Sequence, residues 1–138
     1  MHIFIPFEPV ACSRPRVTRY GTYYSAPYKT FKKAVTDYLK KNYLAGMFKD
    51  SLLTIEYLFI MPRPKSLYRK KDCDGRIHHS KKPDLDNLIK SINDVLQLSN
   101  IIEDDSKIYQ VSACKQIAAK DEKAHIKLKI TVCGGKDE

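Results

Sequence analysis

The stretch PDLDNLIKSINDVLQL (83–98) decides the fold prediction. Its apolar side chains recur every three or four residues, which is the spacing of one face of an α-helix. The proline at its start favours a helix N-terminus, because proline has no N–H to donate at an interior helical position. We therefore predict an amphipathic helix over residues 84–98. Its apolar face consists of Leu85, Leu88, Ile89, Ile92, Val95 and Leu96.

The segments around this helix have the composition of β-strands and of one further helix. LLTIEYLFIM (52–61) is rich in β-branched and aromatic residues, as expected of a central strand. A short link containing AAKDEK (118–123) joins the last two strands, which predicts an antiparallel hairpin. The predicted strands are 2–7, 52–61, 107–117 and 125–132, and a second helix begins at Ser25 and Pro27 and ends before Gly46.

This order of elements, β-α-β-α-β-β, predicts an α+β fold in which two helices pack on a four-stranded mixed sheet. The 138 residues form a single domain, 1–138, without an internal repeat. Residues 10–24 are predicted to be a loop. Residues 62–83 contain three prolines and lack periodicity, so we predict a long basic loop that is either functional or disordered. We expect residues 134–138 to be a frayed tail.

Composition excludes several classes of protein. With 43% hydrophobic and 30% charged residues, the chain is a globular domain and not a disordered tail. Its apolar runs are far shorter than the roughly 20 residues that a membrane-spanning helix needs. Its four cysteines have neither a disulfide framework nor the spacing of zinc ligands. We therefore expect reduced thiols, a cytoplasmic location and no membrane partner.

Charge is strongly segregated along the chain. The net charge of +9 predicts a polyanionic partner, with nucleic acid first. Residues 14–41 carry a net charge of +7 and residues 63–83 carry +6, whereas residues 84–105 carry six carboxylates against one lysine, a net of −5. A protein that only bound phosphates would gain nothing from these acids. Acid within basic surroundings is typical of a metal-dependent phosphodiesterase, in which carboxylates hold the cation.

The acidic residues suggest specific roles. Asp84 and Asp86 stand at the start of the predicted helix, and Lys90 follows Asp86 by one turn. Asp104 and Asp105 open the next strand. If the two groups converge, they offer the oxygen ligands that Mg²⁺ prefers, and Lys90 can offset charge that develops on the phosphate. The alternative is that Asp84 and Asp86 only cap the helix.

The segment KPDLDNLIKSINDVLQLSNIIEDDSKI (82–108) resembles the signature of the RusA family of Holliday-junction resolvases. That signature is a D-x-D-N-x-x-K helix followed about twenty residues later by an Asp-Asp pair. The resemblance implies a RusA-like fold and a small homodimeric endodeoxyribonuclease that uses Mg²⁺, for which Mn²⁺ substitutes. Such an enzyme resolves four-way junction DNA by paired symmetric nicks through a metal-activated water. It also implies a phage or prophage origin.

The resemblance assigns roles residue by residue. Asp84, Asp86 and Asp105 correspond to the metal-binding carboxylates, and Lys90 to the catalytic lysine. Asp104 matches the first member of the pair, whose role stays open, as does the number of metal ions. The basic segments supply the expected DNA contacts, which are Arg14, Arg16, Arg19, Lys70, Lys71, Arg76, Lys81 and Lys82.

Two other functions remain open at this point. One is a different metal-dependent nuclease that acts on flaps, RNA or ordinary duplex with the same acids. The other is a non-enzymatic basic DNA-binding module, in which the aspartates merely cap a helix.

Overall fold

The computed structural model describes residues 1–13, 16–23 and 25–133 of the chain. The helices and strands are β1 (His2–Ile5), β2 (Arg16–Thr18), β3 (Gly21–Tyr23), α1 (Ala26–Asn42), β4 (Leu53–Met61), β5 (Ile77–His78), α2 (Leu85–Leu98), β6 (Ile108–Ile117) and β7 (His125–Val132), and two short 3₁₀ turns are η1 (Lys65–Leu67) and η2 (Asp105–Lys107).

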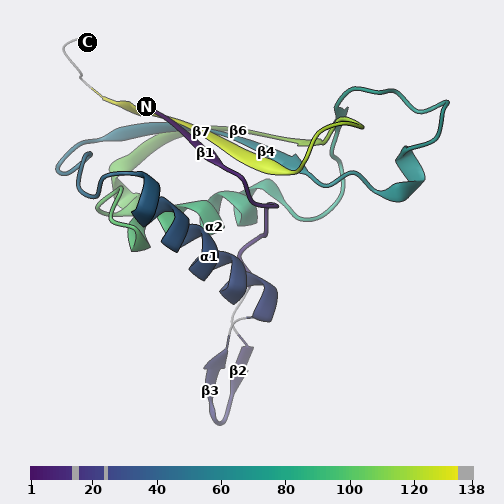
Figure 1. Ribbon diagram of the computed structural model, residues 1–138. Helices are drawn as coiled ribbons and strands as arrows, with labels where there is room; N and C mark the ends of the chain where they lie inside the picture. Colours follow the sequence, from purple (N-terminus) through teal and green to yellow (C-terminus); the bar gives the residue numbers. More distant parts are fainter. Residues whose placement is uncertain (14–15, 24, 134–138) are drawn as a thin grey trace.

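The architecture is α+β, as predicted. Both helices lie on one face of a mixed sheet, and the opposite face is left open (Figure 1). The sheet has five strands in the order β1-β7-β4-β6-β5, not the four predicted. The additional strand, β5, has two residues and comes from the predicted basic loop.

The predicted hairpin between the last two strands is wrong. β6 pairs with β4 in parallel and β7 pairs with β4 antiparallel, so the two strands lie on opposite sides of β4. Residues 118–124 cross the end of β4, where the Ala118 N–H donates to the carbonyl of Met61 at 2.9 Å. Two strand spacings amount to about 10 Å, which this connection spans easily. The central position suits β4, because most of its side chains are buried.

A second correction concerns residues 10–24, which were predicted to be a loop. β2 and β3 pair antiparallel and form a two-stranded hairpin that projects from the body near the start of α1 (Figure 1). Gly21 has φ +134° at its turn, a conformation that residues with a Cβ rarely adopt. The Thr18 hydroxyl accepts from the Tyr20 N–H at 3.2 Å and donates to the Gly21 carbonyl at 3.3 Å.

Both helices bury one face against the sheet. In α2 the fully buried apolar residues are Leu88, Ile92, Val95 and Leu96, which agrees with the predicted face. α1 buries Phe31, Val35 and Leu39 in the same core. Because the spacing of the apolar residues fixes which face turns inward, it also fixes which polar residues of α2 remain at the surface.

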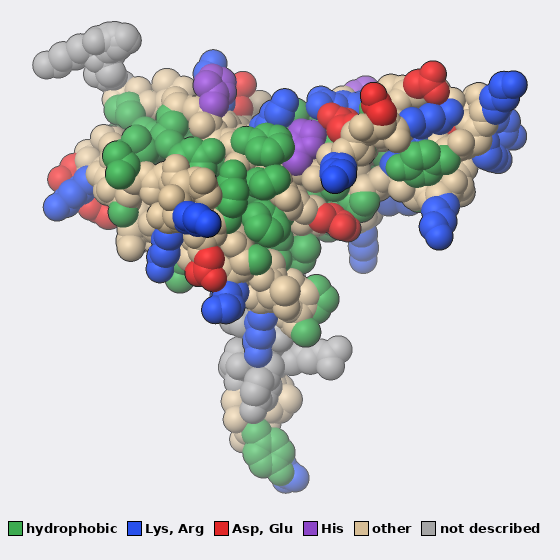
Figure 2. All heavy atoms as spheres, in the orientation of Figure 1, with side chains coloured by type: hydrophobic (Ala, Val, Ile, Leu, Met, Phe, Trp, Pro, Cys, Tyr) green, Lys and Arg blue, Asp and Glu red, His purple; other side chains and the backbone are tan. Residues whose placement is uncertain are grey.

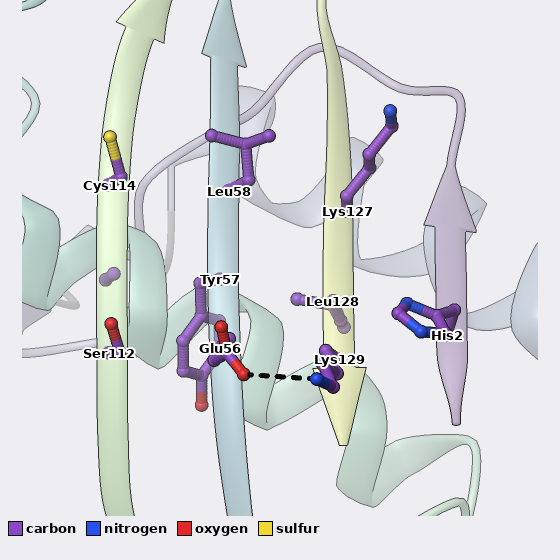
Figure 3. A pocket seen from close by; sticks show the side chains of 10 residues that line it. His2, Glu56, Tyr57, Leu58, Ser112, Cys114, Lys127, Leu128 and Lys129 are labelled. Atoms are coloured by element: carbon purple, nitrogen blue, oxygen red, sulfur yellow. Dashed lines mark ion pairs between the residues drawn. The ribbon is translucent and has the colours of Figure 1, made fainter. Parts of the chain in front are cut away.

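The open face of the sheet carries a shallow hollow of about 350 Å³. Figure 3 shows it lined by side chains of β1, β4, β6 and β7, with Glu56 and Lys129 forming an ion pair of 3.9 Å across neighbouring strands. Alternate residues of a strand point to opposite faces. The hollow is therefore separated by the sheet from the polar side chains of α2.

Neither helix of the described chain combines the length and the apolar character that a membrane crossing requires.

Packing of α2 leads to a first prediction. Leu96→Ala should lower the free energy of unfolding by about 2–5 kcal/mol, because this side chain is fully buried and its removal leaves a cavity. Leu98→Ala is the matched control on the same helix, since Leu98 is 49% exposed; its effect should stay within about 0.5 kcal/mol. Urea denaturation measures both. Equal effects would contradict the assigned face of α2.

Candidate active site

The start of α2 presents two exposed carboxylates. Asp84 is the N-cap residue of the helix, but its side chain accepts no capping hydrogen bond. Asp86, in the first turn, accepts from the N–H of Asn87 at 2.9 Å through one oxygen. Within the described residues Asp84 forms neither a side-chain hydrogen bond nor an ion pair. A capping hydrogen bond therefore does not explain why an aspartate stands at this position.

The polar face of α2 forms a stripe that we call the α2 stripe, consisting of Asp86, Lys90 and Asp94. These residues are four apart, so each lies about 6 Å along the helix axis from the next. Lys90 is exposed and makes no ion pair with any described residue. Asp94 is half-buried and accepts a hydrogen bond from the hydroxyl of Tyr28. The stripe thus alternates acid, base and acid.

Two tyrosines hold the third turn of α2 in place. Tyr28, at the start of α1, donates to Asp94, and Tyr57, in β4, donates to Asn93 Oδ1 at 2.6 Å. Burial raises the pKa of the Tyr57 hydroxyl far above its ordinary value, so Tyr57 stays a neutral donor. Sequence reasoning missed these residues. Only Asp94, the partner of Tyr28, carried a signal in the sequence, because it follows Lys90 by four residues.

The Asp104–Asp105 pair reaches the helix through a tight turn. The N–H groups of Ile101 and Ile102 both donate to the carbonyl of Leu96, at 3.0 and 3.3 Å, and both side chains are buried. Asp104 Oδ1 then accepts from the N–H of Ser106 at 2.8 Å and begins η2. The chain between α2 and β6 is therefore folded back against the end of the helix.

Asp105 experiences the charges of the α2 stripe. The hydrogen bond with the Asp104 carboxyl raises the pKa of Asp105 above its usual value; burial and the charges of Asp104 and Asp94 act in the same direction, and Lys90 opposes them. The hydrogen bond from the Ser106 N–H lowers the pKa of Asp104. Repulsion among these acids would be relieved by a bound cation.

The structure thus brings some of the predicted residues together and leaves others apart. Asp105 lies within the electrostatic influence of Lys90 and Asp94, in the middle of α2, whereas Asp84 and Asp86 lie one to three turns further toward the N-terminus, about 6–15 Å along the axis. Among residues 1–13, 16–23 and 25–133, no three His, Cys, Asp or Glu side chains form a group able to hold a metal ion. All four cysteines are free.

The donor chemistry nevertheless fits a hard divalent cation. The carboxylate of Asp84 and the second oxygen of Asp86 have no hydrogen-bond partner among the described residues. The acidic neighbours of Asp105 disfavour its ionised form. Carboxylate oxygens are the ligands that Mg²⁺ prefers, and Mg²⁺ usually keeps several waters and needs only one or two carboxylates from the protein.

The first basic segment is only partly described. Arg14 lies outside the described residues, and Arg16 is described as part of strand β2 without its side chain. Arg19, at the turn of the hairpin, places its guanidinium 5.2 Å from the centre of the Tyr20 ring. Arg19 and Tyr20 are exposed at the tip of this projection. Figure 2 shows that this hairpin projects from the body of the protein and that its tip is basic.

The second basic segment, residues 62–83, is built around one buried arginine. Arg63 is only 7% exposed and donates to the carbonyls of Leu67, Cys73, Gly75 and Ala118 at 2.6–3.2 Å. From the neighbouring turn Lys120 Nζ donates to the carbonyls of Arg69 and Asp72 at 2.8 and 2.9 Å. We call this segment the basic arm. Its path is fixed by side-chain to backbone bonds, which no local sequence pattern indicates.

The arm presents most of its predicted DNA contacts to solvent. Lys70 and Lys71 are exposed, as are Lys81 and Lys82, and Figure 2 shows Lys and Arg side chains gathered at its end. Arg76 is different, because its guanidinium pairs with Glu122 at 2.6–3.2 Å. This residue ties the arm to the β6–β7 connection, and its role as a phosphate contact stays a prediction.

The Arg76–Glu122 pair leads to a pH prediction. The hydrogen bond from Arg76, aided by the Ala119 N–H, lowers the pKa of Glu122 to about 2, so the folded state keeps this carboxylate ionised at a pH where the unfolded chain binds a proton. The stabilisation is complete above the unfolded value near 4.5 and is lost as the pH falls toward 2. The difference in unfolding free energy between the wild type and Glu122→Gln should therefore shrink from pH 5 to pH 2.

Urea denaturation at several pH values measures this difference. Asp121→Asn is the matched control, because Asp121 is exposed and forms no ion pair with any described residue. A difference between the wild type and Glu122→Gln that is constant with pH would contradict the depressed pKa of Glu122.

Comparison with known proteins agrees with this geometry. Residues 6–131 match the family model described as endodeoxyribonuclease RusA, which covers nearly the whole chain. No curated protein matches the chain. The match includes the α2 stripe, the Asp104–Asp105 pair and both basic segments. The chain therefore belongs to the RusA endodeoxyribonuclease family and is a hydrolytic nuclease.

Proposed function

We propose that this nuclease is a Mg²⁺-dependent, structure-specific endodeoxyribonuclease that resolves four-way (Holliday) junctions by paired symmetric nicks. The observation that carries the proposal is that Asp105, in η2, lies within the electrostatic influence of Lys90 and Asp94 of the α2 stripe, so that acids from two elements act with one lysine. Membership of the RusA family supports the same chemistry.

Each acidic residue has a role in this proposal. Asp84, Asp86 and Asp105 hold the Mg²⁺, for which Mn²⁺ substitutes. The cation supplies Lewis-acid stabilisation of the phosphate that is cut. Lys90, one turn after Asp86 on the same face of α2, offsets the negative charge that develops on the departing oxygen. The hydroxyls of Tyr28 and Tyr57 keep the third turn of α2 in register with Lys90.

DNA is held by the hairpin and the basic arm. Both project from the body (Figure 1). The hairpin exposes Arg19 at its tip, and the arm exposes Lys70, Lys71, Lys81 and Lys82, which neutralise backbone phosphates. Because a four-way junction presents two equivalent phosphates related by a two-fold axis, a homodimer places one site on each. The proposal includes such a dimer, a cytoplasmic location and a prophage origin.

The alternative of a DNA-binding module rests on helix capping. The Asp84 side chain makes no capping bond, so this residue gives that alternative no support. Another nuclease specificity would use the same acids. Competition between four-way and linear DNA at matched salt separates that specificity from junction resolution.

The acidic residues give the prediction that tests the proposal. Asp84→Asn and Asp105→Asn should each lower the cleavage rate at least about 100-fold, because each removes a carboxylate that holds the cation. Junction binding without divalent cation should be unchanged or tighter, since repulsion of the phosphates is relieved. Cleavage of a labelled junction and a gel-shift titration measure the two effects.

The matched control is Asp37→Asn, on the exposed side of α1, where Asp37 pairs with Lys33 at 3.9 Å. This variant should cleave at the rate of the wild type. If Asp84→Asn and Asp105→Asn changed only thermal stability and left cleavage intact, the assignment of the acidic residues would be wrong.

A further inference from the structure

The segment that leads into α2 is held by one side chain. Lys115, in β6, donates through its Nζ to the carbonyl of Lys81 at 2.6 Å and to the carbonyl of Pro83 at 2.7 Å. Within the part of the chain that the structure describes, these are the only hydrogen bonds to residues 80–83. Pro83 has no N–H of its own to donate. The position of this segment therefore depends on the two hydrogen bonds that its carbonyls accept from Lys115.

Lys115 is itself firmly placed. It pairs in register with Phe59 of β4, the central strand, and Phe59 is fully buried beneath the helices. On the other side of β6, the carbonyl of Lys115 accepts from the N–H of His79 at 3.4 Å. The ammonium thus extends from the strand, on the helix-covered face, to the residue directly before Asp84.

The two carboxylates at this end of α2 have little local support. Asp84 makes no capping bond, and Asp86 bonds only to the N–H of its own neighbour. The first hydrogen bond of the helix runs from the Leu88 N–H to the Asp84 carbonyl at 3.2 Å. The first turn is also held by the buried Leu88 and by the Asn87 carbonyl, which accepts from the N–H of Cys12 at 3.0 Å. Asp84, at the N-cap, depends in addition on the backbone that leads into the helix.

We propose that Lys115 is a positioning residue, which anchors the start of α2 to the sheet and so fixes Asp84 and Asp86 relative to the rest of the site. This proposal rests on the proposed function, in which these carboxylates bind a divalent cation. Hydrogen bonds from a charged donor are stronger than those from a neutral donor, so the two bonds from the Lys115 ammonium can hold this segment firmly. Lys115 does not itself touch the DNA or the cation.

Three variants test the proposal. Lys115→Met keeps the length of the side chain but has no donor, and Lys115→Arg keeps the charge and the donors. Lys127→Met is the matched control, because Lys127 lies on the open face of the sheet and has no ion pair among the described residues (Figure 3).

Two readouts apply to each variant. Exchange of the Leu88 amide proton, followed by NMR, reports on the first turn of α2 without any substrate or metal. Titration with Mn²⁺, followed by electron paramagnetic resonance, reports on the affinity of the carboxylates for a divalent cation. Junction affinity without divalent cation shows whether DNA binding is affected.

Lys115→Met should exchange the Leu88 amide faster and should bind Mn²⁺ about 10-fold more weakly, as expected when a residue that orients metal ligands is lost. Its junction affinity should stay at the wild-type value. Lys115→Arg should restore both readouts, and Lys127→Met should change neither.

The proposal is overturned if Lys115→Met keeps wild-type Leu88 exchange and Mn²⁺ affinity, or if it weakens junction binding alone. If Lys115→Met does not fold, Lys115→Arg decides the question. This variant keeps the donors, so a change in its Leu88 exchange or in its Mn²⁺ affinity would also overturn the proposal. If the wild-type protein neither binds Mn²⁺ nor cleaves junctions, the proposed function fails, while Leu88 exchange still decides the anchoring role of Lys115.

Discussion

The packing of α2 against the central strand is the interaction on which the rest of the structure depends. Four fully buried side chains on one face of the helix, Leu88, Ile92, Val95 and Leu96, hold it against the sheet. Because the helix is rigid, this contact also directs Asp86, Lys90 and Asp94 to the other face. The loop that follows α2 then returns Asp105 to the same helix. One hydrophobic contact therefore arranges acids that are separated by about twenty residues in the sequence.

The charge distribution gives this arrangement its function. The excess of positive charge lies in residues 14–41 and in the basic arm, at whose end Figure 2 shows Lys and Arg side chains gathered. DNA held by these cations approaches carboxylates that repel its phosphates, unless a divalent cation is bound between them. The basic arm is stiffened from within by Arg63, so it offers its lysines at a lower cost in conformational entropy than a free loop would.

Much of this architecture can be predicted from the sequence, where local patterns decide it. The α2 helix, the central strand β4 and the bounds of β7 follow from the periodicity and composition of their residues. The placement of β6 and β7 on either side of β4 could not be predicted from a short connection, because it depends on which strand gains most from burial on both sides. The β2–β3 hairpin has few apolar residues and lacked a periodic signal.

The site was predictable in its residues and less so in its geometry. Asp84, Asp86 and Lys90 stand where helical spacing places them, and the Asp104–Asp105 pair follows at a recognisable distance in the sequence. That Asp105 lies near the middle of α2 depends on the turn through Ile101 and Ile102, whose hydrogen bonds reach back to Leu96. The contacts of Arg76 with Glu122 and of Lys115 with Pro83 join residues more than thirty positions apart, and no local pattern indicates them.

The measurement that tests the central claim most directly is cleavage of a labelled, immobile four-way junction in Mg²⁺, compared with EDTA and with linear duplex of the same sequence at matched salt. The account predicts paired nicks placed symmetrically across the junction, which require the divalent cation and which the linear duplex does not show. Binding without nicking in Mg²⁺ and in Mn²⁺, or equal cleavage of the linear duplex, would contradict it.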